Sequence, residues 1–147
     1  MKNILVPVDL SPVSGRLVDH AASIARAFGA KLWVIHVAAP DPDFVGFKTG
    51  PQYVRGQRAE VLRQEHVDLQ QLAERQRIGG INAEALLVQG PTTATILDEV
   101  ARLRADMIVM GSHGHSGLFA SLMGNVCTQV LEETTVPMLI VPVRENA

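Results

Sequence analysis

The amino-acid sequence predicts one α/β domain: a doubly wound parallel sheet of five strands flanked by four helices. Short apolar runs alternate with longer segments whose apolar residues recur every three or four positions, as in buried strands and amphipathic helices. The 147 residues, 47% of them hydrophobic and without an internal repeat, suit a single domain spanning residues 1–147. The predicted strands are 3–8, 31–37, 83–88, 107–110 and 138–143, and the predicted helices are 12–28, 54–77, 91–103 and one that begins at 124.

Local signals mark the ends of these elements. Ser11 is a good N-cap for the first helix, and Pro12 a good first helical residue because its missing N–H would be unpaired there. Gly29 suits a left-handed residue after that helix, and Gly79-Gly80 closes the second. Prolines and glycines interrupt residues 38–53, so we expect a loop there that either connects elements on the surface or covers a site as a lid.

Charge and cysteine content restrict the class of protein. A net charge of −2 at pH 7 gives no basic field for a nucleic-acid backbone. The single cysteine, Cys127, cannot form an internal disulfide, and its apolar spacing predicts a core position. The sequence shows neither a signal peptide nor an apolar stretch long enough to span a membrane. We therefore expect a soluble cytoplasmic protein that binds neither nucleic acid nor membrane.

A glycine-rich segment follows the fourth predicted strand. Gly111, Gly114 and Gly124 have the spacing G-x2-G-x9-G, and Asn125 follows in a segment with helical spacing. Glycine backbone N–H groups and a helix N-terminus at Gly124-Asn125 would together form an anion site suited to phosphates. The pattern is neither a P-loop nor a dinucleotide fingerprint. The alternative is that these glycines only turn the chain and cap a helix.

The same residues resemble the universal stress protein family. Its nucleotide-binding members carry this glycine spacing followed by Ser or Thr, and the phrase Val-Met-Gly-Ser-His-Gly-His-Ser-Gly-Leu at residues 109–118 is close to theirs. The opening phrase Val-Pro-Val-Asp-Leu-Ser at residues 6–11 is also similar. The resemblance extends from Ile4 to Val143. Asn125 departs from the pattern, although an amide can also donate a hydrogen bond to a phosphate.

The resemblance implies a strand order of 3-2-1-4-5 and a regulatory, stress-response protein that binds ATP in the crevice between strands 1 and 4, with at most slow hydrolysis. It further implies a homodimer through the last strand, and Mg²⁺ held by the phosphates without dedicated protein ligands. The adenosine end would contact Pro7, Val8, Asp9 and Val37, with Gly90 near the ribose. The phosphates would contact Met110, Gly111, His113, Gly114, Gly124, Asn125 and Val126.

Other interpretations of single residues are open. From spacing alone, Asp9 could simply brace the turn that follows it. His36 alternates to the side opposite Val37 and is better interpreted as a packed or partly exposed histidine than as a ligand. His113 and His115 lie beside serines, but loop residues two apart have no fixed facing, no G-x-S-x-G elbow is present, and a third metal ligand is missing.

Two rival functions belong to other classes. One is a family member that has lost nucleotide binding and acts through protein contacts, a reading that Asn125 encourages. The other is an enzyme that acts at a nucleotide's α-phosphate. Such enzymes use a phosphate loop near the N-terminus, whereas residues 9–15 contain only one glycine, Gly15.

Overall fold

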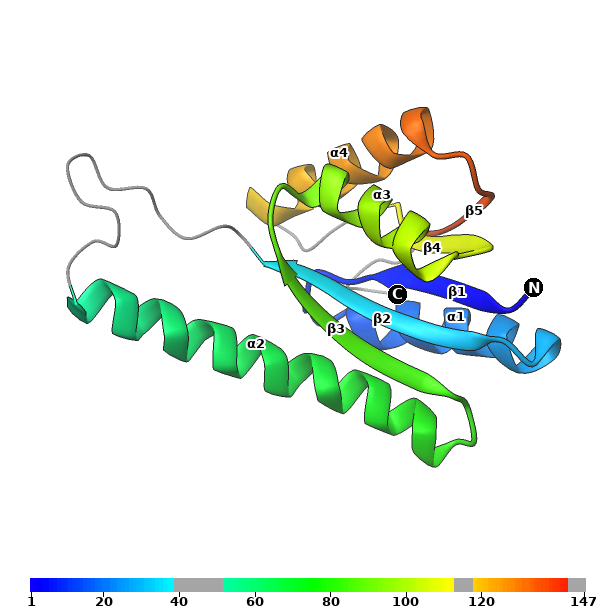
Figure 1. Cartoon of the computed structure of the whole chain (residues 1–147), viewed down its shortest axis with the longest axis horizontal. Coiled ribbons are helices and arrows are strands. Elements are labelled where there is room, and N and C mark those ends of the chain that lie inside the picture. The colour runs from blue at the N-terminus through cyan, green and yellow to red at the C-terminus, as the bar shows by residue number, and fades with distance from the viewer. Residues whose placement is uncertain (39–51, 113–117, 143–147) are drawn as a thin grey trace.

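The computed structural model describes residues 1–38, 52–112 and 118–142, with their side chains except those of 52–56 and 118–125. Strands and helices alternate along these parts of the chain (Figure 1). In chain order the elements are β1 (Asn3–Pro7), α1 (Ser14–Phe28), β2 (Lys31–Ala38), α2 (Gln52–Ile78), β3 (Ala83–Gln89), α3 (Thr92–Leu103), β4 (Met107–Gly111), α4 (Leu118–Glu133) and β5 (Met138–Val141).

The strands form one parallel sheet in the order β3-β2-β1-β4-β5, which confirms the predicted order. β1 lies at the centre and pairs with β2 from Asn3–Lys31 to Pro7–Ile35. On its other side, β1 pairs with β4 at Ile4–Met107 and Leu5–Ile108. From β1 the chain adds β2 and β3 on one side of the sheet, and then adds β4 and β5 on the other side. The topological switch point therefore lies between β1 and β4.

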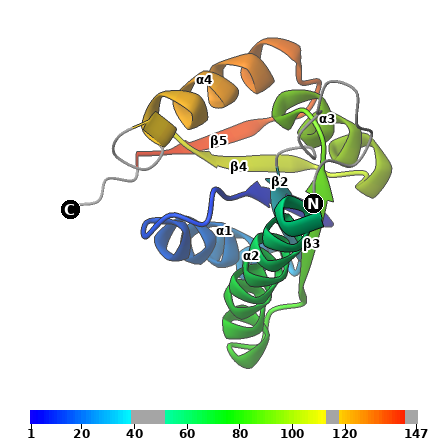
Figure 2. The same ribbon diagram turned by 90° about the vertical axis from the view of Figure 1, so that its left-hand side faces the viewer.

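Helices cover both faces of the sheet (Figure 2). Alternate residues of each strand point to opposite faces, and two apolar clusters result. The first joins α1 and α2 to one face through residues such as Ile4, Val6, Leu17, Leu69 and Ala73. The second joins α3 and α4 to the other face through residues such as Leu5, Ile35, Ile96, Met110 and Cys127. The predicted core position of Cys127 is confirmed, since only 5% of the residue is exposed.

Helix α2 runs opposite to the strands, and its N-terminal part projects beyond their carboxyl ends (Figure 1). Its 27 residues span about 40 Å. Leu69 and Ala73 of this helix are fully buried. On α1, Asp19 accepts hydrogen bonds from the Arg75 guanidinium at 3.0 Å and the Gln76 amide at 2.8 Å. The C-terminal half of α2 is therefore fixed by both apolar and polar contacts.

The predicted start of the last helix is wrong. Helix α4 begins at Leu118, so Gly124 and Asn125 lie inside it and not at its N-terminus. Residues 118–123 are Leu-Phe-Ala-Ser-Leu-Met, most of which favour helix, and one interior glycine costs only about 1 kcal/mol. The free backbone N–H groups of α4 are consequently those of its first turn, residues 118–121.

The other element ends differ from the prediction by one or two residues, the usual uncertainty. The helix-closing roles of Gly29 and Gly80 are confirmed, with φ of 64° and 90°. The predicted loop 38–53 overlaps β2 and α2 at its ends, and residues 39–51 lie outside the described residues. No helix in the described part of the chain has the length and apolar character that a membrane crossing requires.

Candidate functional site

The parallel sheet brings most of the predicted site residues to one edge. Pro7 is the last residue of β1, and Val37 is the second-to-last residue of β2. Gly90 follows β3, and Met110 and Gly111 end β4. Asp9 and Gly111 meet at this edge although about 100 residues separate them, because β1 and β4 are neighbours. Carboxyl ends of strands at a switch point are where open α/β sheets bind ligands.

Side-chain burial decides how these residues could contact a ligand. Val8 is 2% exposed and Met110 is fully buried, on opposite faces of the sheet. Their side chains belong to the core, so they can offer a ligand only backbone groups. Val37 is half-buried on the face covered by α3 and α4. Val126 of α4 packs against that same apolar cluster.

Gly90 allows a close approach of β3 to α3. Its φ is +155°, and a Cβ built there would lie 2.5 Å from Thr95 Oγ1. Its N–H donates to the carbonyl of Ala38 at 3.2 Å, so the residue is fixed to the end of β2. The absence of a side chain therefore lets Thr95 of α3 pack directly against the backbone after β3.

The turn after β1 is organised by Asp9. Its Oδ1 accepts hydrogen bonds from the Ser11 backbone N–H at 3.0 Å and the Ser14 hydroxyl at 3.2 Å. Leu10 between them has φ of +62°, a left-handed conformation that is uncommon outside glycine and often found at functional sites. The prediction that Ser11 caps α1 and Pro12 begins it is wrong: α1 begins at Ser14 after Val13, because the Asp9 carboxylate holds residues 11–14 in a separate turn.

Three buried polar atoms near this edge lack a hydrogen-bond partner among the described residues: Asp9 Oδ2, Ser11 Oγ and Ser112 Oγ. Asp9 and Ser11 follow β1, whereas Ser112 follows the neighbouring β4 and donates its N–H to Val141 at 3.0 Å. An unpaired buried polar group costs roughly 1–3 kcal/mol. A carboxylate oxygen and two hydroxyls that follow neighbouring strands at one edge are suited to a polar ligand with both donors and acceptors.

His36 lies under this edge, on the face covered by α2. Its Nδ1 is 2.8 Å from the Val8 carbonyl oxygen, and its Nε2 is 3.5 Å from Glu65 Oε2. The prediction that His36 packs on the side opposite Val37 is confirmed. Sequence reasoning missed Glu65, because the phase of α2 against β2 has no signature in the spacing of charged residues.

Other predicted residues lie wholly or partly outside the described part of the chain. His113 and Gly114 are not described, nor is His115. Gly124 and Asn125 are described only as backbone of α4. Their contact with phosphates stays a prediction, but it no longer rests on a helix N-terminus at Gly124. No cluster of three or more metal-ligating side chains occurs among the residues that the structure describes.

Comparison with known proteins places this geometry in a family. The model of the universal stress protein family matches residues 1–142. A Thermus aquaticus universal stress protein is 33% identical over 95% of this chain and 98% of its own length. The Escherichia coli K12 universal stress protein A is 32% identical over 99% of this chain and 96% of its own.

A solved structure has the same fold in complex with a nucleotide. It is a universal stress protein bound to cAMP, with a TM-score of 0.66 and 25% identity, and the match covers 95% of each chain. On the match of the family model and of these relatives, the chain belongs to the universal stress protein family.

Proposed function

We propose that this protein binds an adenine nucleotide, with ATP the first candidate, at the carboxyl ends of β1 and β4. The observation that carries the proposal is the group of unpartnered buried polar atoms at that edge: Asp9 Oδ2, Ser11 Oγ and Ser112 Oγ. Support also comes from the relative that was solved with cAMP. In this proposal the protein is a regulator whose state depends on the bound nucleotide.

The adenosine end lies against the end of β1 and β2. Asp9 Oδ1 is already committed to the turn, so Oδ2 is the atom that accepts a hydrogen bond from an adenosine hydroxyl or amino group. Pro7, Val8 and Val37 contribute backbone groups and apolar surface. Gly90, fixed to the end of β2 by its bond to the Ala38 carbonyl, lies beside the ribose.

The phosphates lie over the end of β4. The Ser112 hydroxyl donates to a phosphate oxygen, and Met110 and Gly111 supply backbone. His113 and Gly114 continue this loop, and the first turn of α4 adds its free N–H groups and the positive end of its dipole. A Mg²⁺ ion would bridge phosphate oxygens. The sequence offers no arranged general base, so hydrolysis is slow at most.

The proposal includes a homodimer through β5. This strand is at the edge of the sheet, and Leu139 and Ile140 are 36% and 39% exposed. An apolar edge strand favours pairing with another chain. A cytoplasmic location fits a protein that responds to ATP.

Calorimetric titration tests the proposal, with ATP and AMP added to nucleotide-free protein with and without Mg²⁺. Asp9→Asn keeps the acceptor that braces the turn and replaces Oδ2 by an amide, and Ser112→Ala removes one hydroxyl. Each variant should weaken ATP binding about tenfold, because one hydrogen bond to a charged group contributes about 1.5–3 kcal/mol. Ser23→Ala is the matched control, since Ser23 is exposed on α1 and its hydroxyl donates to the Asp19 carbonyl.

Absence of binding at millimolar ATP would overturn the proposal and favour a member that acts through protein contacts. If Asp9→Asn, Ser112→Ala and Ser23→Ala all bound ATP with equal affinity, the nucleotide site would have to lie elsewhere in the protein. Chemical analysis of the incubated nucleotide separates the remaining alternative, because AMP and pyrophosphate as products would indicate an enzyme acting at the α-phosphate. Asn125→Ala and Asn125→Ser then test the predicted phosphate contact of that residue.

A further inference from the structure

His36 connects three elements directly beneath the proposed site. It belongs to β2, its Nδ1 meets the Val8 carbonyl at the end of β1 at 2.8 Å, and its Nε2 faces Glu65 of α2 at 3.5 Å. The side chains of His36 and Glu65 are only 13% and 24% exposed. Interactions between such partly buried groups are screened much less than those at the surface.

The hydrogen-bonding groups define where the protons must be. A carbonyl oxygen can only accept, so Nδ1 of His36 carries a hydrogen. If the ring has no other proton, Nε2 presents a lone pair to the Glu65 carboxylate, whose Oε2 has no hydrogen-bond partner among the described residues. The contact is attractive only when the pair holds one more proton, as imidazolium with carboxylate or as imidazole with carboxylic acid.

The charged groups around the ring leave Glu65 as its direct partner. In the turn after β1, Asp9 is bound to Ser11 and Ser14. On β3, the residue paired with His36 is Leu87, which is apolar. Other charged groups of α1 and α2 lie on this side of the sheet as well. Asp19 is bound by Arg75 and Gln76, Arg77 donates to the Ala83 carbonyl at 2.8 Å, and Arg16 of α1 and Arg58, seven residues before Glu65, are half-buried.

We propose that His36 is a positioning residue for the nucleotide site and that the His36–Glu65 pair makes its action depend on protonation. The Val8 carbonyl is part of the peptide that joins Val8 to Asp9, so the bond from Nδ1 fixes the orientation of that peptide. Asp9 in turn holds the turn at Ser11. His36 also precedes Val37, the predicted adenine contact, on the opposite face of the strand.

The consequence is a site that tightens when the pair gains a proton. With the proton, Glu65 on α2 holds the imidazole, and the imidazole holds the Val8–Asp9 peptide. Without the extra proton, the lone pairs of His36 Nε2 and Glu65 Oε2 face each other, and either the imidazole ring or α2 moves to increase their separation. The effect on ligand binding rests on the proposed function, whereas the effect on the Asp9 turn is a property of the protein alone.

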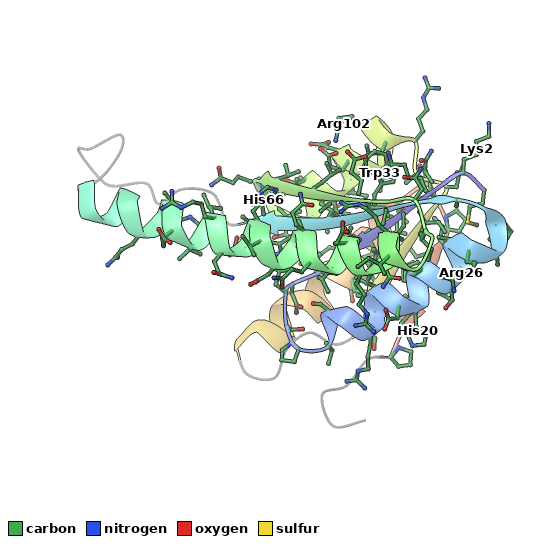
Figure 3. All side chains as sticks on the ribbon, turned by 90° about the horizontal axis from the view of Figure 1, so that it is seen from below. Lys2, His20, Arg26, Trp33, His66 and Arg102 are labelled. Carbon is green, nitrogen blue, oxygen red and sulfur yellow. The ribbon has the colours of Figure 1, made fainter. Side chains whose placement is uncertain are left out.

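Substitutions separate the two contacts of the ring. Glu65→Gln supplies an amide N–H that donates to a neutral Nε2, so the tie persists without the extra proton. His36→Asn places an amide N–H near the position of Nδ1 and retains the bond to Val8, whereas His36→Leu removes both contacts. His66→Asn is the matched control, because His66 is an exposed histidine on α2 next to Glu65. Its Nε2 lies 3.1 Å from the Gln70 amide nitrogen. Figure 3 shows His66 on the middle part of α2, away from Lys2 and Arg26.

The first measurement is ATP affinity between pH 5.5 and 8. As the pH rises, the ATP affinity of wild-type protein and of His66→Asn should fall about fivefold relative to that of Glu65→Gln. A fivefold change corresponds to the contribution of one ordinary hydrogen bond. Titration of the ATP phosphates is common to all the proteins and cancels in this ratio. The ATP affinity of His36→Asn relative to that of Glu65→Gln should not change with pH. His36→Leu should bind ATP more weakly than wild type at every pH.

The second measurement needs no nucleotide. Amide exchange by NMR, corrected for the intrinsic rate, reports the protection of the Ser11 N–H that Asp9 accepts. Protection should fall with rising pH in the wild type and stay constant in Glu65→Gln. If the protein binds no ATP but Ser11 shows this difference, the proposed function fails and the role of His36 stands. Identical pH profiles of Ser11 protection in wild type, Glu65→Gln and His36→Asn would overturn the role of His36, even if His36→Leu failed to fold.

Discussion

Replacement of Gly90 by alanine tests how closely the end of β3 approaches α3. The new Cβ would lie 2.5 Å from Thr95 Oγ1 and 3.8 Å from Thr95 Cβ. Thr95 is a β-branched residue in a helix, where its side chain has few rotamers, and only 8% of it is exposed. The hydroxyl therefore cannot swing away without entering packed atoms, so the backbone or the helix must shift.

Two contributions set the size of the effect. An added methyl group in a packed interior costs about 1–3 kcal/mol. A φ of +155° adds backbone strain for any residue with a Cβ, of order 1–3 kcal/mol. Because the structure relaxes in part, we expect Gly90→Ala to lower the free energy of unfolding by about 3 kcal/mol.

Urea unfolding followed by circular dichroism measures this loss. Gly29→Ala is the matched control, since Gly29 has φ of +64° but nothing within 4 Å of a built Cβ, and it should lose only about 1 kcal/mol. Adding Thr95→Ala to Gly90→Ala should recover about 1 kcal/mol or more through their direct coupling. Equal losses for the two glycine variants, or no recovery in the double variant, would refute the steric argument.

Three further predictions concern core packing, acid stability and thiol reactivity. Leu69→Ala should lower the free energy of unfolding in urea titration by about 3 kcal/mol, because Leu69 is fully buried. Val67 is 48% exposed, so Val67→Ala should change the free energy of unfolding by less than about 0.5 kcal/mol. Similar losses for the two variants would contradict the assignment of the buried face of α2. Hydrogen bonds from the backbone N–H groups of Lys2 and Asn3 lower the pKa of Asp106, so its stabilisation is complete above the unfolded pKa of about 3.9 and disappears as the pH falls through the lower folded value. At pH 7 Asp106→Asn should therefore cost at most about 1 kcal/mol, since the carboxylate is exposed to solvent, and the gap to wild type should close below pH 4; a gap that persisted there would count against the argument. Burial raises the pKa of the Cys127 thiol, so a disulfide reagent at pH 8 should react at least about tenfold more slowly with folded than with urea-unfolded protein, and equal rates would place the thiol at the surface.

The sheet was predictable because its signals are local. Apolar runs that end at glycine, proline or aspartate locate the strands, and alternation correctly put His36 and Val37 on opposite faces. Periodicity alone did not predict the strand order, which came from resemblance to a family. Residues such as Asp9 and Gly111 could be joined into one site only with that order in hand.

Helix starts were less predictable because side chains compete for the same backbone groups. Ser11 and Pro12 have the residue types of a helix start, but the Asp9 carboxylate binds the Ser11 N–H and delays the helix to Ser14. At α4, Gly124 predicts a boundary that the structure does not have, because the residues before it favour helix. The His36–Glu65 contact depends on how two elements pack, and no spacing within either element predicts it.

The central position of β1 has a consequence for how the chain folds during synthesis. β1 pairs on one side with β2, which follows it closely, and on the other with β4, about 100 residues later. At about 5–20 residues per second, β4 leaves the ribosome roughly 4–15 s after β2. During that interval the central strand has an unpaired edge, the kind of surface that promotes aggregation. The bonds from Lys2 and Asn3 to Asp106 close this edge at its beginning, so they should form only after three quarters of the chain has been made.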